Sequence, residues 1–222
     1  MAIAFDDVRS EPGVHGWLHT PERPSGSAIV LTHGAGSDCN AKLLAEMAEA
    51  FAGAGFTVLR FDLPFRRARP HGPPFPAAAA RDRDGLRRAV ALMREKKHQR
   101  IFMGGHSYGG RQASMLAAEE PEVADGLLLF SYPLHPPKKP EELRTKHFSK
   151  LSTPAFFVHG TRDPFATGAE LEAALELIPG AHFVLEVEGA GHELVSKKTG
   201  DELPSRVVRE LLRFMREISR RV

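Results

Sequence analysis

One serine lies between two glycines at a spacing that suits nucleophilic chemistry. Residues 100–111 read RIFMGGHSYGGR, in which Gly105, Ser107 and Gly109 form the pattern G-x-S-x-G. A sharp turn between a strand and a helix crowds the positions two before and two after its central residue, and glycine removes the side chains that would clash. Apolar residues precede the motif and residues at helical spacing follow it. The pattern therefore predicts a turn that exposes the hydroxyl of Ser107 as a nucleophile.

A serine hydroxyl is a poor nucleophile at neutral pH, so it needs a base to accept its proton and a carboxylate to orient that base. Asp163 follows the apolar run 154–160, and His192 ends the glycine-flanked loop 189–192. Each of these residues would lie at the end of a strand, on the same edge of a parallel sheet. We therefore predict Ser107, Asp163 and His192 as the catalytic residues.

A second acid, Asp62, ends the apolar run 57–62 and is the alternative partner for the base. Pro64 and a long loop rich in arginine and proline follow it. This setting is more typical of a residue that anchors a loop, so we expect a structural role for Asp62.

The oxyanion that forms when an acyl carbon is attacked needs backbone N–H donors close to the nucleophile. The apolar run 27–32 leads directly into His33-Gly-Ala-Gly36, where glycines let the backbone approach a substrate closely. We predict one donor at Ala35 or a neighbour and the other at Tyr108, the first residue of the expected helix. His33 is expected to order this loop, and a simple tight turn is the alternative interpretation.

The other candidate residues have weaker support. The chain has eleven histidines, so a histidine near a strand end is not by itself a signal. We interpret His106 as a wall of the substrate pocket and His159 as structural. Tyr132 and Leu134 follow another apolar run and are expected to bind substrate, although they could equally be packing residues within the loop.

Alternating apolar and amphipathic stretches supply the elements that must position these residues. Strands are expected near residues 3–8, 14–19, 27–32, 57–62, 101–103, 126–131, 154–160 and 183–187, the first two as a hairpin. Helices are expected near residues 43–51, 81–97, 108–118 and 168–178 and after Pro204, with a short one over 141–148.

Composition favours one α/β domain spanning residues 1–222, since 42% of the residues are hydrophobic. The net charge of +2 is spread over residues of both signs, so we expect neither nucleic-acid nor membrane partners. A basic helix at 81–97 could contact nucleic acid, but interleaved acids favour a solvated face.

The single cysteine, Cys39, cannot form an internal disulfide, and the N-terminal residues lack a basic leader, so we expect a cytoplasmic protein. Cys39 is expected to be structural, with a reactive thiol as the alternative.

Four motifs resemble those of the α/β-hydrolase superfamily, and the resemblance covers nearly the whole chain. The motifs are Thr32-His-Gly-Ala-Gly36, Gly105-His-Ser-Tyr-Gly-Gly110, His159-Gly-Thr-Arg-Asp163 and Gly189-Ala-Gly-His192. They are similar to those of the small, capless branch related to dienelactone hydrolases, including hydrolases that resemble testis-expressed protein 30. The resemblance implies a three-layer αβα sandwich around a mostly parallel, twisted sheet of about eight strands, without a full cap domain. Dienelactone hydrolases proper use a cysteine nucleophile where this chain has Ser107, so dienelactone is not the expected substrate.

These observations predict a serine hydrolase that acts on a small-molecule acyl substrate, either an ester, a thioester or an amide, through an acyl-enzyme. No cofactor is expected, and no metal, because His192-Glu-Leu-Val-Ser196 does not match H-E-x-x-H. A non-catalytic binding or scaffold protein with the same fold, and an acyltransferase that uses the same three residues, are the alternatives. The sequence leaves the substrate and the oligomeric state open.

Overall fold

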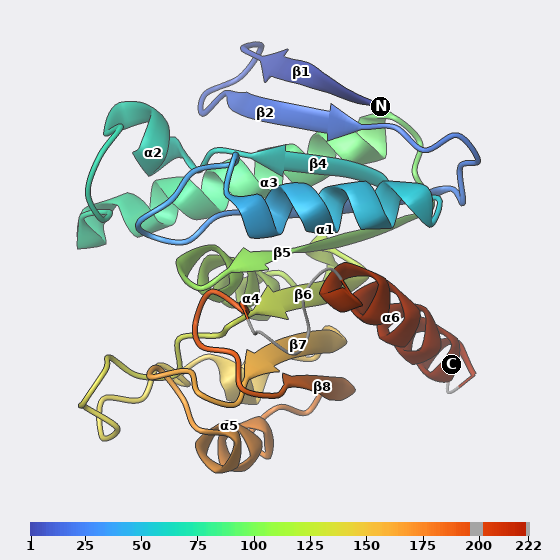
Figure 1. Cartoon of the computed structure of the whole chain (residues 1–222). Coiled ribbons are helices and arrows are strands. Elements are labelled where there is room, and N and C mark those ends of the chain that lie inside the picture. Colours follow the sequence, from blue (N-terminus) through green and yellow to red (C-terminus); the bar gives the residue numbers. More distant parts are fainter. Residues whose placement is uncertain (196–201, 221–222) are drawn as a thin grey trace.

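Eight strands form one sheet at the centre of the computed structural model, which describes residues 1–195 and 202–220 (Figure 1). The strands are β1 (Ala2–Asp7), β2 (Val14–His19), β3 (Ser27–Thr32), β4 (Thr57–Phe61), β5 (Arg100–His106), β6 (Gly126–Phe130), β7 (Ala155–Gly160) and β8 (His182–Val187). Their order across the sheet is β1-β2-β4-β3-β5-β6-β7-β8, with β1, β2 and β4 antiparallel and the other pairs parallel. The expected mostly parallel sheet is confirmed.

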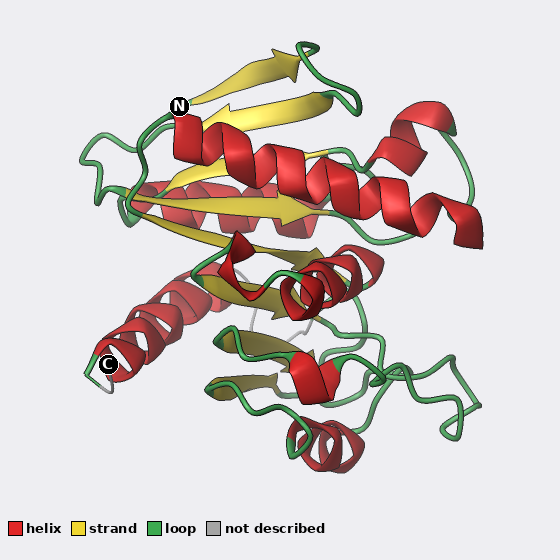
Figure 2. Ribbon diagram, turned by 180° about the vertical axis from the view of Figure 1, so that it is seen from behind, coloured by secondary structure: helices red, strands yellow, loops and turns green. Residues whose placement is uncertain are grey.

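Helices cover both faces of this sheet and make three layers. The helices are α1 (Lys42–Gly53), α2 (Pro64–Ala68), α3 (Ala79–Glu95), α4 (Tyr108–Glu119), α5 (Gly168–Leu175) and α6 (Leu203–Ser219), with short 3-10 turns η1 (Pro76–Ala78), η2 (Pro121–Val123) and η3 (Phe148–Lys150). Figure 1 shows α1 and α6 in front of the sheet, and the reverse view in Figure 2 brings α3 and α4 to the front. Strands β3, β4, β6 and β7 are buried along their whole length, because both of their faces are covered.

The chain leaves two neighbouring strands of the sheet in opposite directions. β3 and β5 lie side by side with Thr32 paired to Gly105. After β3 the chain continues into α1 on one face, and after β5 it continues into α4 on the other face. A crevice opens at the carboxyl ends of strands where the connections diverge in this way. Ser107 and the 33–36 loop therefore meet at the point where an α/β fold binds its ligand.

The segment between β6 and β7 differs from the expectation. A short helix was expected over residues 141–148, but the structure has only turns there, followed by η3. The backbone N–H of Arg144 donates to the carbonyl of Leu134 at 2.8 Å, and the hydroxyl of Tyr132 donates to the carbonyl of Arg144 at 3.0 Å. These contacts occupy backbone groups that a helix would have used. The segment forms no cap domain, and no helix in the described part of the chain is long and apolar enough to cross a membrane.

Candidate active site

The serine motif adopts the strained turn that its glycines predicted. Ser107 has φ 50° and ψ −114°, a conformation that residues other than glycine rarely adopt, and it directly precedes α4. A Cβ added to Gly105 would lie 2.1 Å from the carbonyl oxygen of Thr32, and one added to Gly109 would lie 2.6 Å from that of His33. The turn is therefore possible only with glycine at both positions, and it pins β5 and α4 against the end of β3.

Ser107, His192 and Asp163 form one hydrogen-bonded chain. The Ser107 hydroxyl lies 2.8 Å from His192 Nε2, and His192 Nδ1 lies 2.8 Å and 3.0 Å from the two carboxylate oxygens of Asp163. Because a carboxylate can only accept, His192 carries its proton on Nδ1 and leaves Nε2 free to accept from the serine. The Asp163 side chain is fully buried, whereas 15% of the His192 side chain is exposed. The imidazole is therefore in contact with solvent, while its carboxylate partner is shielded from water.

Two loops that are distant in sequence hold the imidazole and the carboxylate together. The N–H of Arg162 donates to the carbonyl of Ala190 at 2.8 Å, and the N–H of Gly189 donates to the hydroxyl of Thr161 at 2.9 Å. A Cβ on Gly160 would lie 2.5 Å from the Ala190 carbonyl oxygen, so the two loops pack at backbone distance. The loop after β7 and the loop after β8 therefore act as one unit.

The His192 ring contacts two other rings. Phe165 lies 4.1 Å away between ring centroids, tilted by 32°, and its N–H donates to Asp163 Oδ1 at 2.9 Å. The ring of His106 lies 5.0 Å away between centroids, and its Nε2–H donates to the His192 carbonyl at 2.8 Å. Burial lowers the pKa of His106, so this residue stays neutral beside His192. Sequence reasoning missed Phe165, whose only signal was its place two residues after the acid.

The two predicted oxyanion donors lie in the same pocket as the serine. Ala35, Ser107 and Tyr108 all line an open pocket of about 540 Å³. A Cβ on Gly34 would lie 3.5 Å from the Ser107 Cβ, which shows how closely the 33–36 loop approaches Ser107. The backbone at both donors is thus near enough to the serine to face a group bound there.

Hydrogen bonds polarise the peptide that carries the Ala35 N–H. The carbonyl of that peptide belongs to Gly34, and it accepts from His33 Nδ1 at 2.8 Å and from the N–H of Ser37 at 3.3 Å. His33 accepts the Leu63 N–H on Nε2 at 3.1 Å, which fixes the tautomer that donates from Nδ1. Burial lowers the pKa of His33 and keeps it neutral. A carbonyl that accepts two bonds makes the N–H of the same peptide a stronger donor.

Arg66 and Asp82 support these donors from α2 and α3. Arg66 is 7% exposed and donates to the carbonyls of Ala35 and Ser37, each at 2.8 Å. Asp82 is fully buried and accepts the Tyr108 hydroxyl at 2.7 Å, and burial raises its pKa. Neither residue was expected from the sequence. Helix α2 is short and starts at a proline, which was its only signal.

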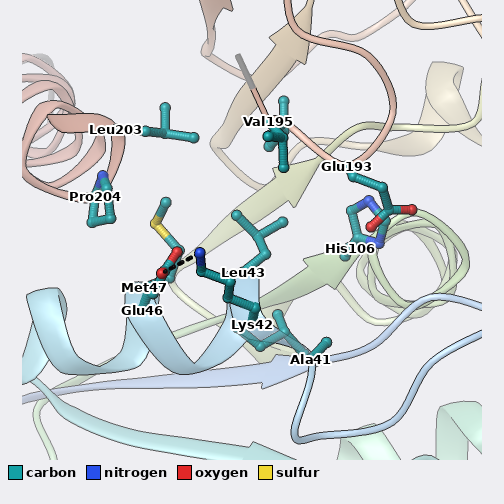
Figure 3. A pocket seen from close by; sticks show the side chains of 12 residues that line it. Ala41, Lys42, Leu43, Glu46, Met47, His106, Glu193, Val195, Leu203 and Pro204 are labelled. Carbon is teal, nitrogen blue, oxygen red and sulfur yellow. Dashed lines mark ion pairs between the residues drawn. The ribbon is translucent and has the colours of Figure 1, made fainter. Parts of the chain in front are cut away.

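The three expected substrate contacts lie elsewhere. Tyr132 is 1% exposed and Leu134 is fully buried, and both belong to the hydrophobic core. The Tyr132 hydroxyl turns inward and donates to the carbonyl of Arg144. His106 lines a different hollow, between α1 and the segment after His192 (Figure 3). The expectation that these three residues form the wall of the serine pocket is therefore corrected.

Two other expectations concern residues near the 33–36 loop. Asp62 accepts the Cys39 N–H at 2.7 Å and lies 3.7 Å from His33 Nε2, so it anchors this loop as expected and does not contact His192. Cys39 is 3% exposed, and burial raises the pKa of its thiol to about 12. His159 is also buried, at 1% exposed.

The chain belongs to the alpha/beta hydrolase family, whose domain it matches over residues 25–219. Its fold is similar to a dienelactone hydrolase from Anabaena variabilis, with 22% identity, 95% of each chain covered and a TM-score of 0.74. It is also similar to an alpha-beta serine hydrolase homologue from Coxiella burnetii, with 16% identity, 95% of this chain and 97% of that chain covered and a TM-score of 0.72. A serine hydrolase without a lid from Xanthomonas campestris has 16% identity, 95% and 94% coverage and a TM-score of 0.69. Membership of this family supports hydrolysis as the general class of activity.

Proposed function

We propose that this chain is a serine hydrolase that cleaves a small carboxylic ester through an acyl-enzyme, with Ser107, His192 and Asp163 as its catalytic residues. The observation that carries the proposal is the distance of 2.8 Å between Ser107 Oγ and His192 Nε2 in a site where Asp163 fixes the opposite ring nitrogen. A hydroxyl so placed can lose its proton to the imidazole as it attacks. No cofactor takes part in this reaction.

The reaction has two steps, acylation of Ser107 and hydrolysis of the acyl-enzyme. Ser107 Oγ bonds to the acyl carbon while its proton moves to His192 Nε2. The new oxyanion accepts hydrogen bonds from the N–H groups of Ala35 and Tyr108. His192 then gives that proton to the departing alcohol, and the acyl group stays on Ser107. Water repeats the sequence in the alcohol's place and releases a carboxylic acid and free Ser107. Asp163 keeps the ring in this orientation and stabilises the imidazolium.

Two further points support an ester as the substrate. The pocket is open and the described residues form no cap domain over it, so a small substrate reaches Ser107 directly. The similar structure from Anabaena variabilis is named a dienelactone hydrolase, and a lactone is a cyclic ester.

We also propose that the protein acts in the cytoplasm, since its single cysteine fits a reducing compartment.

Hydrolysis of p-nitrophenyl esters of increasing acyl length tests the proposal. We expect the wild type to release p-nitrophenol and Ser107→Ala to lose about 10³-fold or more in kcat/KM. Ser205→Ala, on α6, is the matched control and should keep full activity. Equal rates for Ser107→Ala and wild type would contradict the proposal. A folded protein without turnover would favour a binding role, and transfer to an added alcohol in preference to water would favour an acyltransferase.

A further inference from the structure

Two arginines line the pocket that contains Ser107. Arg111 follows Ser107 by one turn of α4, with its N–H donating to the Ser107 carbonyl at 3.0 Å. Residues four apart share a face of a helix and lie about 6 Å apart along its axis. Arg144 comes from the segment between β6 and β7, where Leu134 and Tyr132 fix its backbone. Both arginines therefore line this pocket from anchored backbone positions, and both also line the neighbouring hollow beside Lys146 and His147.

Neither guanidinium has a counterion within residues 1–195 and 202–220, since no ion pair there includes Arg111 or Arg144. The Nε of Arg111 is buried and has no hydrogen-bond partner among the described residues. The side chain of Arg144 donates to the carbonyl of Pro133 at 3.3 Å. By contrast, the neighbouring Arg83 pairs with Glu119 at 3.2 Å. A buried N–H of a charged group without an acceptor is costly, so an acceptor is expected there.

The two positive charges also act on each other. The pKa of Arg144 is lowered, chiefly by burial and then by the charge of Arg111. The charge of Glu142 raises the pKa of Arg144, but Glu142 is exposed and pairs with Lys139 at 2.6 Å. Two like charges in a partly buried pocket destabilise each other, and an anion held between them removes the repulsion.

The rest of the pocket wall is mainly apolar. Pro73, Pro74 and Phe75 from the loop after α2 line it, together with Met115 and Phe165. These side chains can cover a short hydrocarbon segment but offer it no charged partner. The pocket therefore presents a nucleophile, an apolar wall and a pair of unpaired cations.

We propose that Arg111 and Arg144 form an anion-binding subsite for a carboxylate or phosphate that a short apolar segment separates from the bond attacked by Ser107. The proposal rests on the proposed hydrolase function where it names a substrate, but binding of the anion does not require Ser107 to react. Guanidinium groups bind both anions through paired N–H donors. The shared chemistry is an anionic oxygen group at the end of a small ester.

Equilibrium binding to the Ser107→Ala protein tests the subsite without turnover. Calorimetric titration would compare monomethyl adipate with dimethyl adipate, which differ at one end: a carboxylate in the first and a neutral methyl ester in the second. We expect the monoester to bind at least about 10-fold more tightly, and Arg111→Gln to weaken its binding about 10- to 100-fold without changing that of the diester. Lys150→Gln removes a nearby exposed charge that does not line this pocket, and it should change both affinities by less than about 3-fold.

Equal binding of the two adipates, or an equal loss for both in Arg111→Gln, would overturn the subsite. Arg144→Gln provides a second variant if Arg111→Gln unfolds, and Arg111→Lys should recover part of the binding because it keeps the charge. Tighter binding of n-butyl phosphate than of monomethyl adipate supports the subsite with phosphate as its anion, and the reverse order supports a carboxylate.

The same proteins separate this proposal from the proposed function. Ser107-dependent hydrolysis of neutral esters, with no preference for the charged adipate, would leave the hydrolase standing and remove the subsite. Arginine-dependent binding of monomethyl adipate, with no ester hydrolysed by the wild type, would leave the subsite standing and remove the hydrolase.

Discussion

Replacing Asp163 by asparagine should remove most of the activity and leave the fold intact. In the native site Asp163 Oδ1 accepts the Phe165 N–H at 2.9 Å, and Oδ2 faces His192 Nδ1 at 2.8 Å. In the variant the amide oxygen keeps the bond to Phe165, so the amide NH₂ takes the position that faces Nδ1. An NH₂ group only donates, so Nδ1 must become the acceptor and the ring proton moves to Nε2. The Ser107 hydroxyl then meets a donor and has no base.

The loss should be large because the wrong tautomer removes general-base catalysis. We expect kcat to fall by about 10⁴, which corresponds to about 5 kcal/mol of barrier. Steady-state hydrolysis of p-nitrophenyl acetate measures the fall, and thermal unfolding checks the fold. The two side chains have the same shape, so the unfolding midpoint should shift by less than about 4 °C.

Asp62→Asn is the matched control because Asp62 is the other acid at a strand end. Its carboxylate anchors the Cys39 N–H and does not contact His192, so kcat should fall by less than about 10-fold. Asp163→Asn with more than a tenth of the wild-type kcat, together with an inactive Asp62→Asn, would refute the assignment of the acid.

Three further predictions follow from one hydrogen bond and from the burial of two side chains. Tyr108→Phe leaves the buried Asp82 carboxylate without its 2.7 Å partner, so the free energy of unfolding in urea should fall by about 1–3 kcal/mol while the backbone donor at residue 108 keeps kcat within about 10-fold. The Cys39 thiol, with its pKa raised to about 12, is only about 10⁻⁴ ionised at pH 8, so a thiol reagent such as Ellman's should react only after unfolding. Burial lowers the pKa of His147 to about 4, so the unfolded chain binds its proton first as the pH falls. The free energy of unfolding should therefore decrease from pH 6.5 towards pH 4, by up to about 1.4 kcal/mol per pH unit for this residue, and His147→Gln should flatten that slope in urea titrations.

The order of strands and helices could be predicted because burial left a clear pattern. The stretches that became β3, β6 and β7 are short and almost wholly apolar, as strands covered on both faces must be. The helix expected over 141–148 was wrong because side-chain and backbone contacts from Tyr132 and Leu134 occupy the backbone of Arg144. Such contacts between distant residues of one loop leave no periodic signal in the sequence.

The residues that the structure brings to the serine fall into two groups by the kind of signal they carry. Ser107, Asp163 and His192 follow the ends of strands, each within three residues of a glycine, so the topology indicated that they meet. Phe165 and Arg66 act through packing and through bonds to carbonyls, which depend on where loops fold. The prediction for Tyr132 was wrong because a residue after a strand can face either the pocket or the core. The Tyr132 hydroxyl donates to the carbonyl of Arg144, and the side chain is buried in the core.

The central claim is that Ser107 is an activated nucleophile, and covalent labelling tests it most directly. The folded wild type would be treated with a fluorophosphonate, and the adduct would be counted by intact mass and located by peptide mapping. We predict one adduct per chain, on Ser107, and none in a folded Ser107→Ala variant. Folded wild-type protein that takes up no label, or a Ser107→Ala variant labelled as fully as the wild type, would contradict the account.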